Sequence, residues 1–293
     1  MTLATGHADR PVTAEVRDGV PVILKRYVTA DAAEVHDVMR ALWASPFGGG
    51  ARVRAGGAPA MPEPLALEHG DTIVMRAVPG VAVGARGDLG RSFPAAVECA
   101  RLLARLHDSG VQVRRRRHAA ALLRSLERKA DRLRTDPWSL AAPWRTTFDA
   151  LARLAPEDEV LVVSHGDFSP RNVLVEGDGP VALIDFDRVQ MASRSRDVEY
   201  WRAWCWATQL LAGDAPDWRC TAPFVDAYVA VGAPGAAAEL AAGERFHRAA
   251  ALLRIAEGWS ALRADPHVAR RVLHEAERTV IEGAGAAPGV TAR

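Results

Sequence analysis

The sequence has few cysteines, few lysines and no long apolar run. Its three cysteines, Cys99, Cys205 and Cys220, lie far apart and form no CxxC pair, which argues against a disulfide framework or a zinc site. No apolar run approaches the length of a membrane span, and the N-terminal MTLATGHADRP lacks the apolar core of a signal peptide. We therefore expect a soluble, cytoplasmic protein with no membrane partner.

The sequence also has no excess of positive or negative charge. The chain has 37 basic and 36 acidic residues, a formal net charge of +1, so no strong overall field favours nucleic acid as a partner. Only Lys25 and Lys129 are lysine; every other basic residue is arginine. With 293 residues, 49% of them hydrophobic, the chain is long enough for one large domain or two lobes.

The first 80 residues are typical of a small β-rich unit. Asp18 and Gly19 stand between two alternating apolar runs, which is a strong hairpin signal. A second hairpin is expected to turn at His69 to Asp71, and glycine and proline clusters make 45–64 a loop. The expected elements are strands at 12–16 and 20–27, a helix at 29–43 capped by Thr29 or Asp31, and a hairpin at 65–78.

Beyond Gly80 the periodicity becomes mainly helical, with a strand pair inside 160–184. No internal repeat is present. We expect an α+β protein with a nucleotide-binding lobe at 1–78, a hinge near 76–80 and a larger helical lobe at 79–293. The helices are predicted at 95–110, 118–134, 139–155, 197–212, 221–231, 236–263 and 266–282.

The chemistry concentrates in SHGDFSPRNVLVEGDGPVALIDFDR, residues 164–188. Asp167 follows a strand-like run, Asn172 comes five residues later, and a hairpin would bring Asp185 beside Asn172. A carboxylate and an amide oxygen suit Mg²⁺, which takes few protein ligands, and Asp167 is then free to accept a proton from a hydroxyl. Phosphoryl transfer needs this division, since catalysis there is mostly positioning and charge neutralisation.

His165-Gly166-Asp167, Asn172 and the IDFD at 184–187 resemble the catalytic segment of the aminoglycoside phosphotransferase and choline kinase families. These are relatives of the protein kinases. The resemblance implies a two-lobed protein-kinase-like fold with a small β-rich N-lobe and a larger helical C-lobe. It also implies that Asp167 is the catalytic base and that His165 braces the loop.

The same resemblance assigns Asn172 and Asp185 to Mg²⁺ and makes Asp197 a structural residue. In the N-lobe it places Lys25 at the phosphates of the nucleotide. Glu34 would hold Lys25 in place, with Asp37 as the alternative. The purine edge would meet the backbone of the connector from Arg76 to Val78, and Gly6 is the only glycine of the segment TGHADRPV that would cover the nucleotide.

The implied activity is Mg²⁺-dependent transfer of the γ-phosphoryl group of ATP or GTP to a hydroxyl. Gly166 and Ser169 replace residues typical of protein kinases, which favours a small hydroxylated molecule as acceptor. Aminoglycoside-type antibiotics, amino alcohols such as choline and hydroxylated natural products all fit, in antibiotic resistance or in biosynthesis. The alternatives are a degenerate nucleotide-binding module and, ranked last, a metal-dependent phosphohydrolase.

Several polar and aromatic features have two interpretations each. Asp187 could bind metal or face solvent, and the second is slightly favoured. The arginine run 114–117 could bind an anion, but a solvated surface is favoured. Trp201 and Trp204 could form a substrate wall, but at helical spacing they are more typical of a core. Four carboxylates could line a site for a cationic substrate, with nothing to select among them: Glu199, Asp214, Asp217 and Glu257.

Overall fold

The computed structural model describes residues 10–28, 31–49, 58–86, 93–133, 140–177, 181–263 and 265–281. The chain begins with a four-stranded antiparallel sheet in the order β1-β2-β4-β3. Asp18 and Gly19 turn the first hairpin with positive φ values of 49° and 77°, as its sharp reversal requires. The strands are β1 (Val12–Arg17), β2 (Val20–Arg26), β3 (Pro64–Glu68) and β4 (Thr72–Arg76).

Helix α1 (Ala32–Ala44) lies between the two hairpins in the sequence and contacts β3 and β4. The Asp31 side chain caps it by accepting a hydrogen bond from the backbone N–H of Glu34. The order strand, strand, helix, strand, strand is therefore confirmed, with Asp31 and not Thr29 as the cap.

Two smaller sheets follow. One has the order β5-β7-β8 and the other pairs β6 with β9, in antiparallel register throughout. The sequence predicted the β7-β8 pair and a strand-like run at β6. It did not predict β5 or β9, which have two and three residues and no turn signal between them and their partners. The bounds are β5 (Val81–Ala82), β6 (Val162–Ser164), β7 (Val173–Val175), β8 (Val181–Leu183) and β9 (Gln190–Ala192), with 3-10 turns η1 (Val83–Arg86), η2 (Phe186–Arg188) and η3 (Trp218–Thr221).

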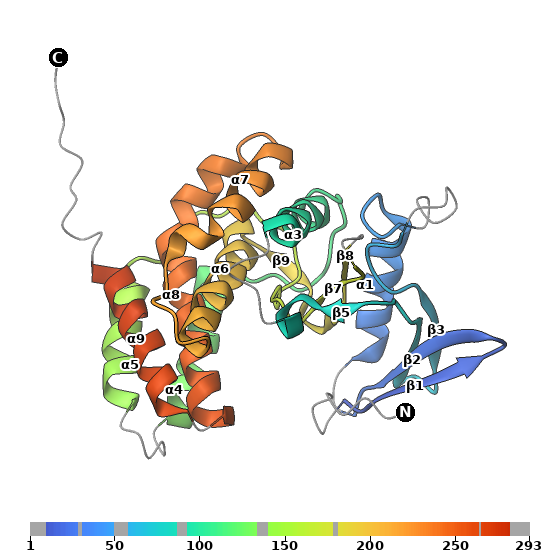
Figure 1. The fold of residues 1–293 in the computed structure, drawn as a ribbon, viewed down its shortest axis with the longest axis horizontal. Helices are drawn as coiled ribbons and strands as arrows, with labels where there is room; N and C mark the ends of the chain where they lie inside the picture. The colour runs from blue at the N-terminus through green and yellow to red at the C-terminus, as the bar shows by residue number, and fades with distance from the viewer. Residues whose placement is uncertain are drawn as a thin grey trace.

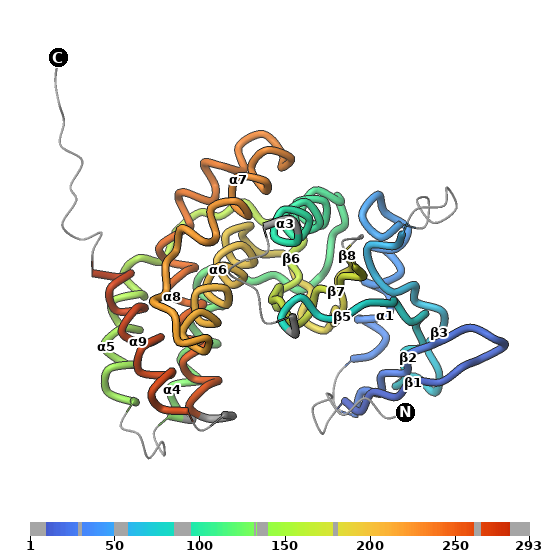
Figure 2. The backbone as a smooth tube through the Cα atoms, viewed as in Figure 1, coloured from blue at the N-terminus to red at the C-terminus, as the bar shows by residue number. Residues whose placement is uncertain are grey.

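The rest of the described chain is helical, and each predicted helix forms within a few residues of its expected bounds. Figures 1 and 2 show the sheet and α1 at one end, the bundle of α4, α5, α8 and α9 at the other, and α3 beside the short strands. The helices are α3 (Phe93–His107), α4 (Ala119–Leu133), α5 (Ala141–Ala152), α6 (Arg194–Leu211), α7 (Ala222–Val231), α8 (Ala236–Arg263) and α9 (Pro266–Ile281).

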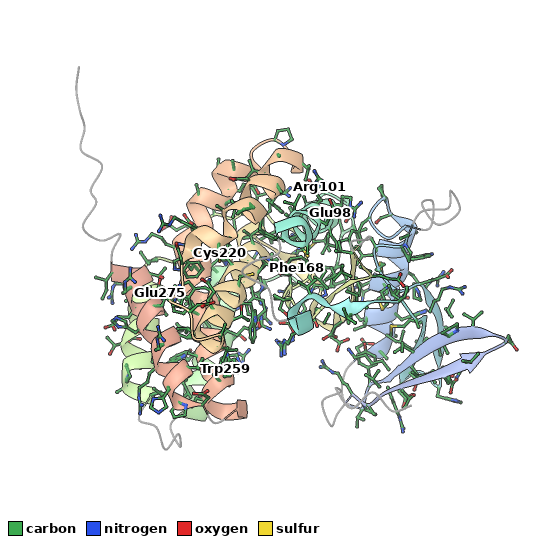
Figure 3. All side chains as sticks on the ribbon, viewed as in Figure 1. Glu98, Arg101, Phe168, Cys220, Trp259 and Glu275 are labelled. Atoms are coloured by element: carbon green, nitrogen blue, oxygen red, sulfur yellow. The ribbon has the colours of Figure 1, made fainter. Side chains whose placement is uncertain are left out.

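The buried hydrophobic residues form two cores. One runs from the N-terminal sheet and α1 through α3 to the short strands, and the other fills the helical bundle. Phe168 is labelled in Figure 3 where the helices meet the short strands; it is buried in the first core, with its ring 5.2 Å from that of Trp201. Among the described residues, no helix is both long and apolar enough to span a bilayer.

Candidate active site

The loop between β6 and β7 carries the predicted catalytic residues, and its entry is fixed through its backbone. The N–H groups of His165 and Gly166 donate to the carboxylate of Asp197 at 2.7 and 2.9 Å. Gly166 has φ +75°, and a Cβ there would stand 2.4 Å from the carbonyl oxygen of Arg188. Only glycine therefore fits at this position.

Asp197 is held by a buried chain of polar groups. It accepts a hydrogen bond from His107 Nε2 at 3.3 Å, while His107 Nδ1 lies 2.6 Å from the hydroxyl of Tyr228. Arg194 donates in turn to that hydroxyl at 3.2 Å. Burial alone would raise the pKa of Asp197, but its hydrogen bond from His107 keeps it below the usual value. The carboxylate stays charged and organises the loop.

His165 lies in the interior and does not reach solvent. Its Nε2 is 3.0 Å from the carbonyl oxygen of Ile184, and its ring packs edge-on against Phe168 and Phe186. These contacts tie the loop to the segment that follows β8 and leads to Asp185. They suit the bracing role that the sequence predicts for His165.

Asp167 pairs with two arginines. Arg254 on α8 donates to its carboxylate at 2.7 Å and to the carbonyl oxygen of Gly166 at 3.0 Å, and Arg188 Nε lies 3.9 Å away. Burial raises the pKa of Asp167, but the charges of Arg254 and Arg188 outweigh it and lower the pKa to about 2. Asp167 is therefore a carboxylate at neutral pH and can accept a hydrogen bond from a hydroxyl.

Asn172 and Asp185 lie at neighbouring ends of β7 and β8. The N–H of Ile184 donates to the carbonyl oxygen of Asn172 at 2.9 Å, which brings Asp185 to the same edge. Asn172 Nδ2 donates to the carbonyl oxygen of Asp167 at 2.9 Å, so its amide oxygen is left for a cation. Asp185 has φ +67°, an uncommon conformation for a residue other than glycine.

This pair has the donor set of a magnesium site, one carboxylate and one amide oxygen. No group of three or more His, Cys, Asp or Glu side chains suited to a metal occurs in the part of the chain that the structure describes. A cation held by this pair would complete its coordination with water and phosphate oxygens.

Lys25 reaches this edge from the N-terminal lobe. Its Nζ lies 2.6 Å from both Asp185 Oδ1 and Asp187 Oδ2. Asp187 also accepts from the hydroxyl of Tyr27 at 2.6 Å and from Arg10 at 2.9 Å, and its side chain is only 5% exposed. The interpretation of Asp187 as a solvent-facing residue is therefore wrong, since Asp187 joins the two lobes.

Glu34 is not brought to Lys25. Within the described residues Lys25 pairs with the two carboxylates above, and no ion pair connects it to Glu34 or Asp37. Because α1 starts only at Ala32, Glu34 falls in the first turn, where it is exposed and can complement the helix dipole.

The connector from Arg76 to Val78 and the segment that contains Gly6 are the remaining parts of the predicted nucleotide site. Arg76 ends β4, and its backbone N–H is already bonded to the carbonyl oxygen of Glu63 at 2.9 Å. The backbone of Val78 makes no hydrogen bond to the other described residues, so its N–H is open to a ligand. Gly6 lies outside the described residues.

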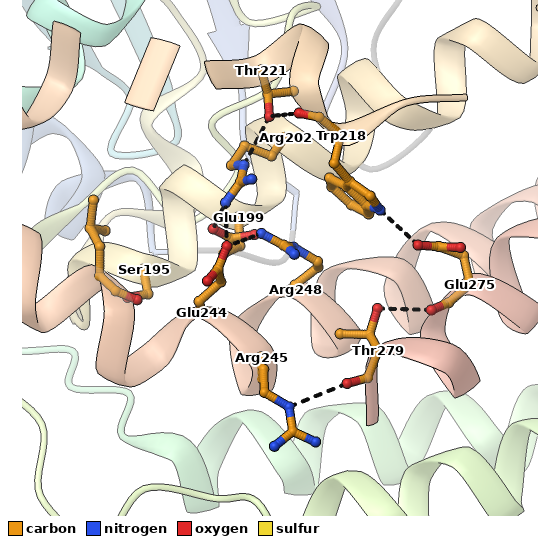
Figure 4. A network of polar contacts seen from close by, with 11 residues as sticks. Ser195, Glu199, Arg202, Trp218, Thr221, Glu244, Arg245, Arg248, Glu275 and Thr279 are labelled. Carbon is orange, nitrogen blue, oxygen red and sulfur yellow. Dashed lines mark hydrogen bonds and ion pairs between the residues drawn. The ribbon is translucent and has the colours of Figure 1, made fainter. Parts of the chain in front are cut away.

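Most of the carboxylates considered for a cationic substrate are already paired. Glu199, 2% exposed, binds Arg202 and Arg248, which also share Glu244 in the network of Figure 4. Lys129 binds Glu257, and Arg219 binds Asp217. Asp214 is exposed. Trp201 and Trp204 are both buried, so the prediction that they belong to the core is confirmed.

A cavity of about 610 Å³ opens between α6, η3 and α9, beside the Figure 4 network. None of the catalytic-loop residues lines it, so we place the chemistry at the loop and not in this cavity. Its lining consists of Trp206, Pro216, Asp217, Trp218, Arg270, Arg271, His274, Glu275 and Arg278.

Sequence reasoning did not identify the arginines around Asp167. It also did not identify Tyr27, His107 and Tyr228. In a chain this rich in arginine no single arginine is conspicuous, and Arg254 lies 87 residues from Asp167. Asp167, Asn172 and Asp185 gave a signal because they lie close together in the sequence.

The model of the phosphotransferase enzyme family matches residues 4–242, which is most of the chain and includes every site residue described above except Arg254. The chain belongs to this family. No curated protein matches the chain. The family assignment therefore rests on the family model, and the solved structures below support the fold.

Solved structures of known phosphotransferases share the fold. An aminoglycoside phosphotransferase APH(4)-Ia mutant, in a ternary complex with AMP-PNP and hygromycin B, has a TM-score of 0.63 at 16% identity, over 98% of this chain and 94% of that one. A choline kinase from Cryptosporidium parvum Iowa II has a TM-score of 0.64 at 12% identity, over 95% and 91%. The protein-kinase-like fold with a small sheet-containing N-lobe and a helical C-lobe is thus confirmed.

Proposed function

We propose that this phosphotransferase moves the γ-phosphoryl group of ATP or GTP to a hydroxyl of a small molecule, with Mg²⁺. The observation that carries the proposal is the meeting of Lys25 from one lobe with the Asp185 end of the other, beside Asn172 and the Asp167 loop. The solved relatives that bind AMP-PNP with hygromycin B, or ADP with spectinomycin, support the same pairing of nucleotide and acceptor.

Asp167 orients the acceptor hydroxyl. With a pKa near 2 it is a weak base, so it accepts a hydrogen bond from the hydroxyl and takes the proton as the new bond to phosphorus forms. This suits a loose transition state, in which positioning matters more than early deprotonation. The fixed loop holds Asp167 in place through Asp197 and Gly166.

Lys25 provides a compact positive charge for nucleotide phosphates. When nucleotide binds, the Lys25 ammonium would exchange Asp185 for phosphate oxygens. Its ion pair with Asp187 would keep the Lys25 side chain at the junction of the lobes. Asn172 and Asp185 would hold Mg²⁺, which neutralises phosphate charge when bound. The open N–H of Val78 would meet the purine edge.

Two substitutions test the proposal. In the wild-type protein, nucleotide at 100 times its Kd should stabilise the folded state by about 2.7 kcal/mol and raise the Tm in the presence of Mg²⁺. Asp185→Asn should abolish this Mg²⁺-dependent rise in Tm with both ATP and GTP. Asp167→Asn should keep that shift and lose phosphoryl transfer. Unchanged nucleotide binding in Asp185→Asn would overturn the metal assignment. If the wild-type chain binds nucleotide but phosphorylates no cationic, neutral or anionic acceptor, the degenerate nucleotide-binding module would be favoured.

A further inference from the structure

The surroundings of Asp167 are strongly cationic. Besides Arg254 and Arg188, which contact it, Arg196 and Arg117 lie close enough to Arg254 for their charges to interact. These four guanidinium groups lie in one neighbourhood, where Asp167 and Asp197 are the carboxylates that act most strongly on Arg254 and Arg196. We call this group the arginine cluster. Such a concentration of like charge is costly unless an anion offsets it.

Arg196 is the least satisfied member. It lies in the first turn of α6, and its Nε and Nη1 are inaccessible to water and have no hydrogen-bond partner among the described residues. Burial, then the charges of Arg254 and Arg117, lower the pKa of Arg196 to about 9, so it still carries its charge at pH 7. A buried guanidinium with unmade hydrogen bonds is destabilising and calls for a partner.

Arg117 comes from the run of four arginines at 114–117. Its backbone N–H donates to the carbonyl oxygen of Met191 at 2.8 Å, and Met191 N–H donates to Arg115 at 2.7 Å. This pairing beside β9 leaves Arg114, Arg115 and Arg116 exposed and Arg117 partly buried. The solvated-surface interpretation therefore fails for Arg117, whose pKa falls to about 10 through burial and neighbouring arginines.

Two carboxylates that could attract a cationic acceptor are already paired. Glu199 on α6 and Glu257 on α8 are buried and bind arginine and lysine, respectively. Arg254 also stacks over Tyr200, with its guanidinium carbon 4.2 Å from the ring centroid, which fixes its position. A cationic acceptor would therefore approach Asp167 through a field that repels it.

We propose that the acceptor is an anionic hydroxyl compound, with a phosphate or carboxylate bound by Arg196 and Arg117 and its hydroxyl directed to Asp167. Guanidinium groups bind both anions through paired, charge-assisted hydrogen bonds. The inference rests on the proposed function for the transfer step. The anion site itself is independent of that step.

The test uses the full chain and four probes: glycerol 3-phosphate, glycerate, glycerol and choline. We expect thermal shifts with one or both anions and none with glycerol or choline, and the two anionic probes separate phosphate from carboxylate recognition. Arg117→Gln and Arg196→Gln should each weaken anion binding at least about tenfold. Arg114→Gln, from the same run but exposed, is the matched control and should bind like wild type.

A second measurement separates a binding role from a structural one. Since Arg196 is unsatisfied without ligand, Arg196→Gln should keep or raise the Tm of the ligand-free protein while losing the anion shift. A lower Tm with intact anion binding would overturn the proposal. Stronger binding of choline than of either anion would also overturn the proposal. If Arg117→Gln and Arg196→Gln lost affinity for MgATP and kept their affinity for the anions, the arginine cluster would instead belong to the nucleotide site. Anion binding that persists without any MgATP binding would instead refute the proposed function and leave the anion site standing.

Discussion

At the scale of single residues, backbone conformation limits which residue types fit at two positions of the site. Asp185 and Gly166 both have positive φ, 67° and 75°, and each sits where a strand gives way to the site. The uncommon conformation of Asp185 lets the chain turn sharply into η2, which begins at Phe186. A strained residue such as Asp185 is typical of functional sites, where surrounding contacts hold it in place, whereas glycine adopts positive φ without strain.

Gly166→Ala tests the backbone argument. The new Cβ would meet the carbonyl oxygen of Arg188 at 2.4 Å, so we expect a loss of about 2 kcal/mol or more in unfolding free energy, together with loss of activity. Gly110→Ala is the matched control, with φ +73° and nothing within 4 Å of its Cβ. It should cost only about 1 kcal/mol. Denaturant titration compares them, and equal losses would show that the contact with Arg188 is unimportant.

At the scale of elements, the catalytic loop is positioned by helices and not by its own strands. β6 and β7 have three residues each, too few to hold a loop by themselves. Asp197 from α6, His107 from α3 and Tyr228 from α7 supply the missing constraint. This chain of hydrogen bonds requires the neutral His107 tautomer with its proton on Nε2. In that tautomer Nε2 donates to Asp197 and Nδ1 accepts from the hydroxyl of Tyr228.

This chain of hydrogen bonds predicts a pH dependence of stability. Burial lowers the pKa of His107 below 6.5, so below pH 6.5 the unfolded chain binds a proton that the folded protein does not. Stability should therefore fall as the pH drops below 6.5, because the unfolded chain gains a proton that the folded protein binds less readily. In His107→Gln this part of the loss should vanish, while exposed His267→Gln keeps it. Urea titrations at pH 7.5 and 5.5 measure the difference, and equal losses in all three proteins would contradict it.

At the scale of the whole molecule, the lobes are joined where the chemistry would occur. The N–H of Leu183 in β8 donates to the carbonyl oxygen of Ala60 at 2.8 Å, and Asp187 binds Lys25, Tyr27 and Arg10 across the junction. Burial raises the pKa of Asp187, but the charge of Lys25 outweighs it and keeps the pKa below its usual value. The ionised Asp187 is thus a fixed anchor for the N-lobe.

Asp187→Asn should loosen the N-lobe selectively. Removing one partner of a buried ion pair costs on the order of 1–3 kcal/mol, so amides in β2 and β4 should exchange with solvent at least about tenfold faster. Amides in α8 should keep their rates. Glu63→Gln, which breaks the more exposed pair with Arg76 in the same lobe, is the control. Hydrogen exchange that accelerates equally in both lobes, or in neither, would show that Asp187 does not anchor the N-lobe.

The sequence alone determined the order of the longer elements and the local part of the site. Hairpins turn at glycine and aspartate, helices follow apolar periodicity, and Asp167, Asn172 and Asp185 lie within 19 residues; all of these are short-range signals. The tertiary structure decided the partners. Lys25 meets Asp185 and Asp187 and not Glu34, and Arg254 meets Asp167, because such pairs depend on how distant helices and lobes pack, which no local pattern records.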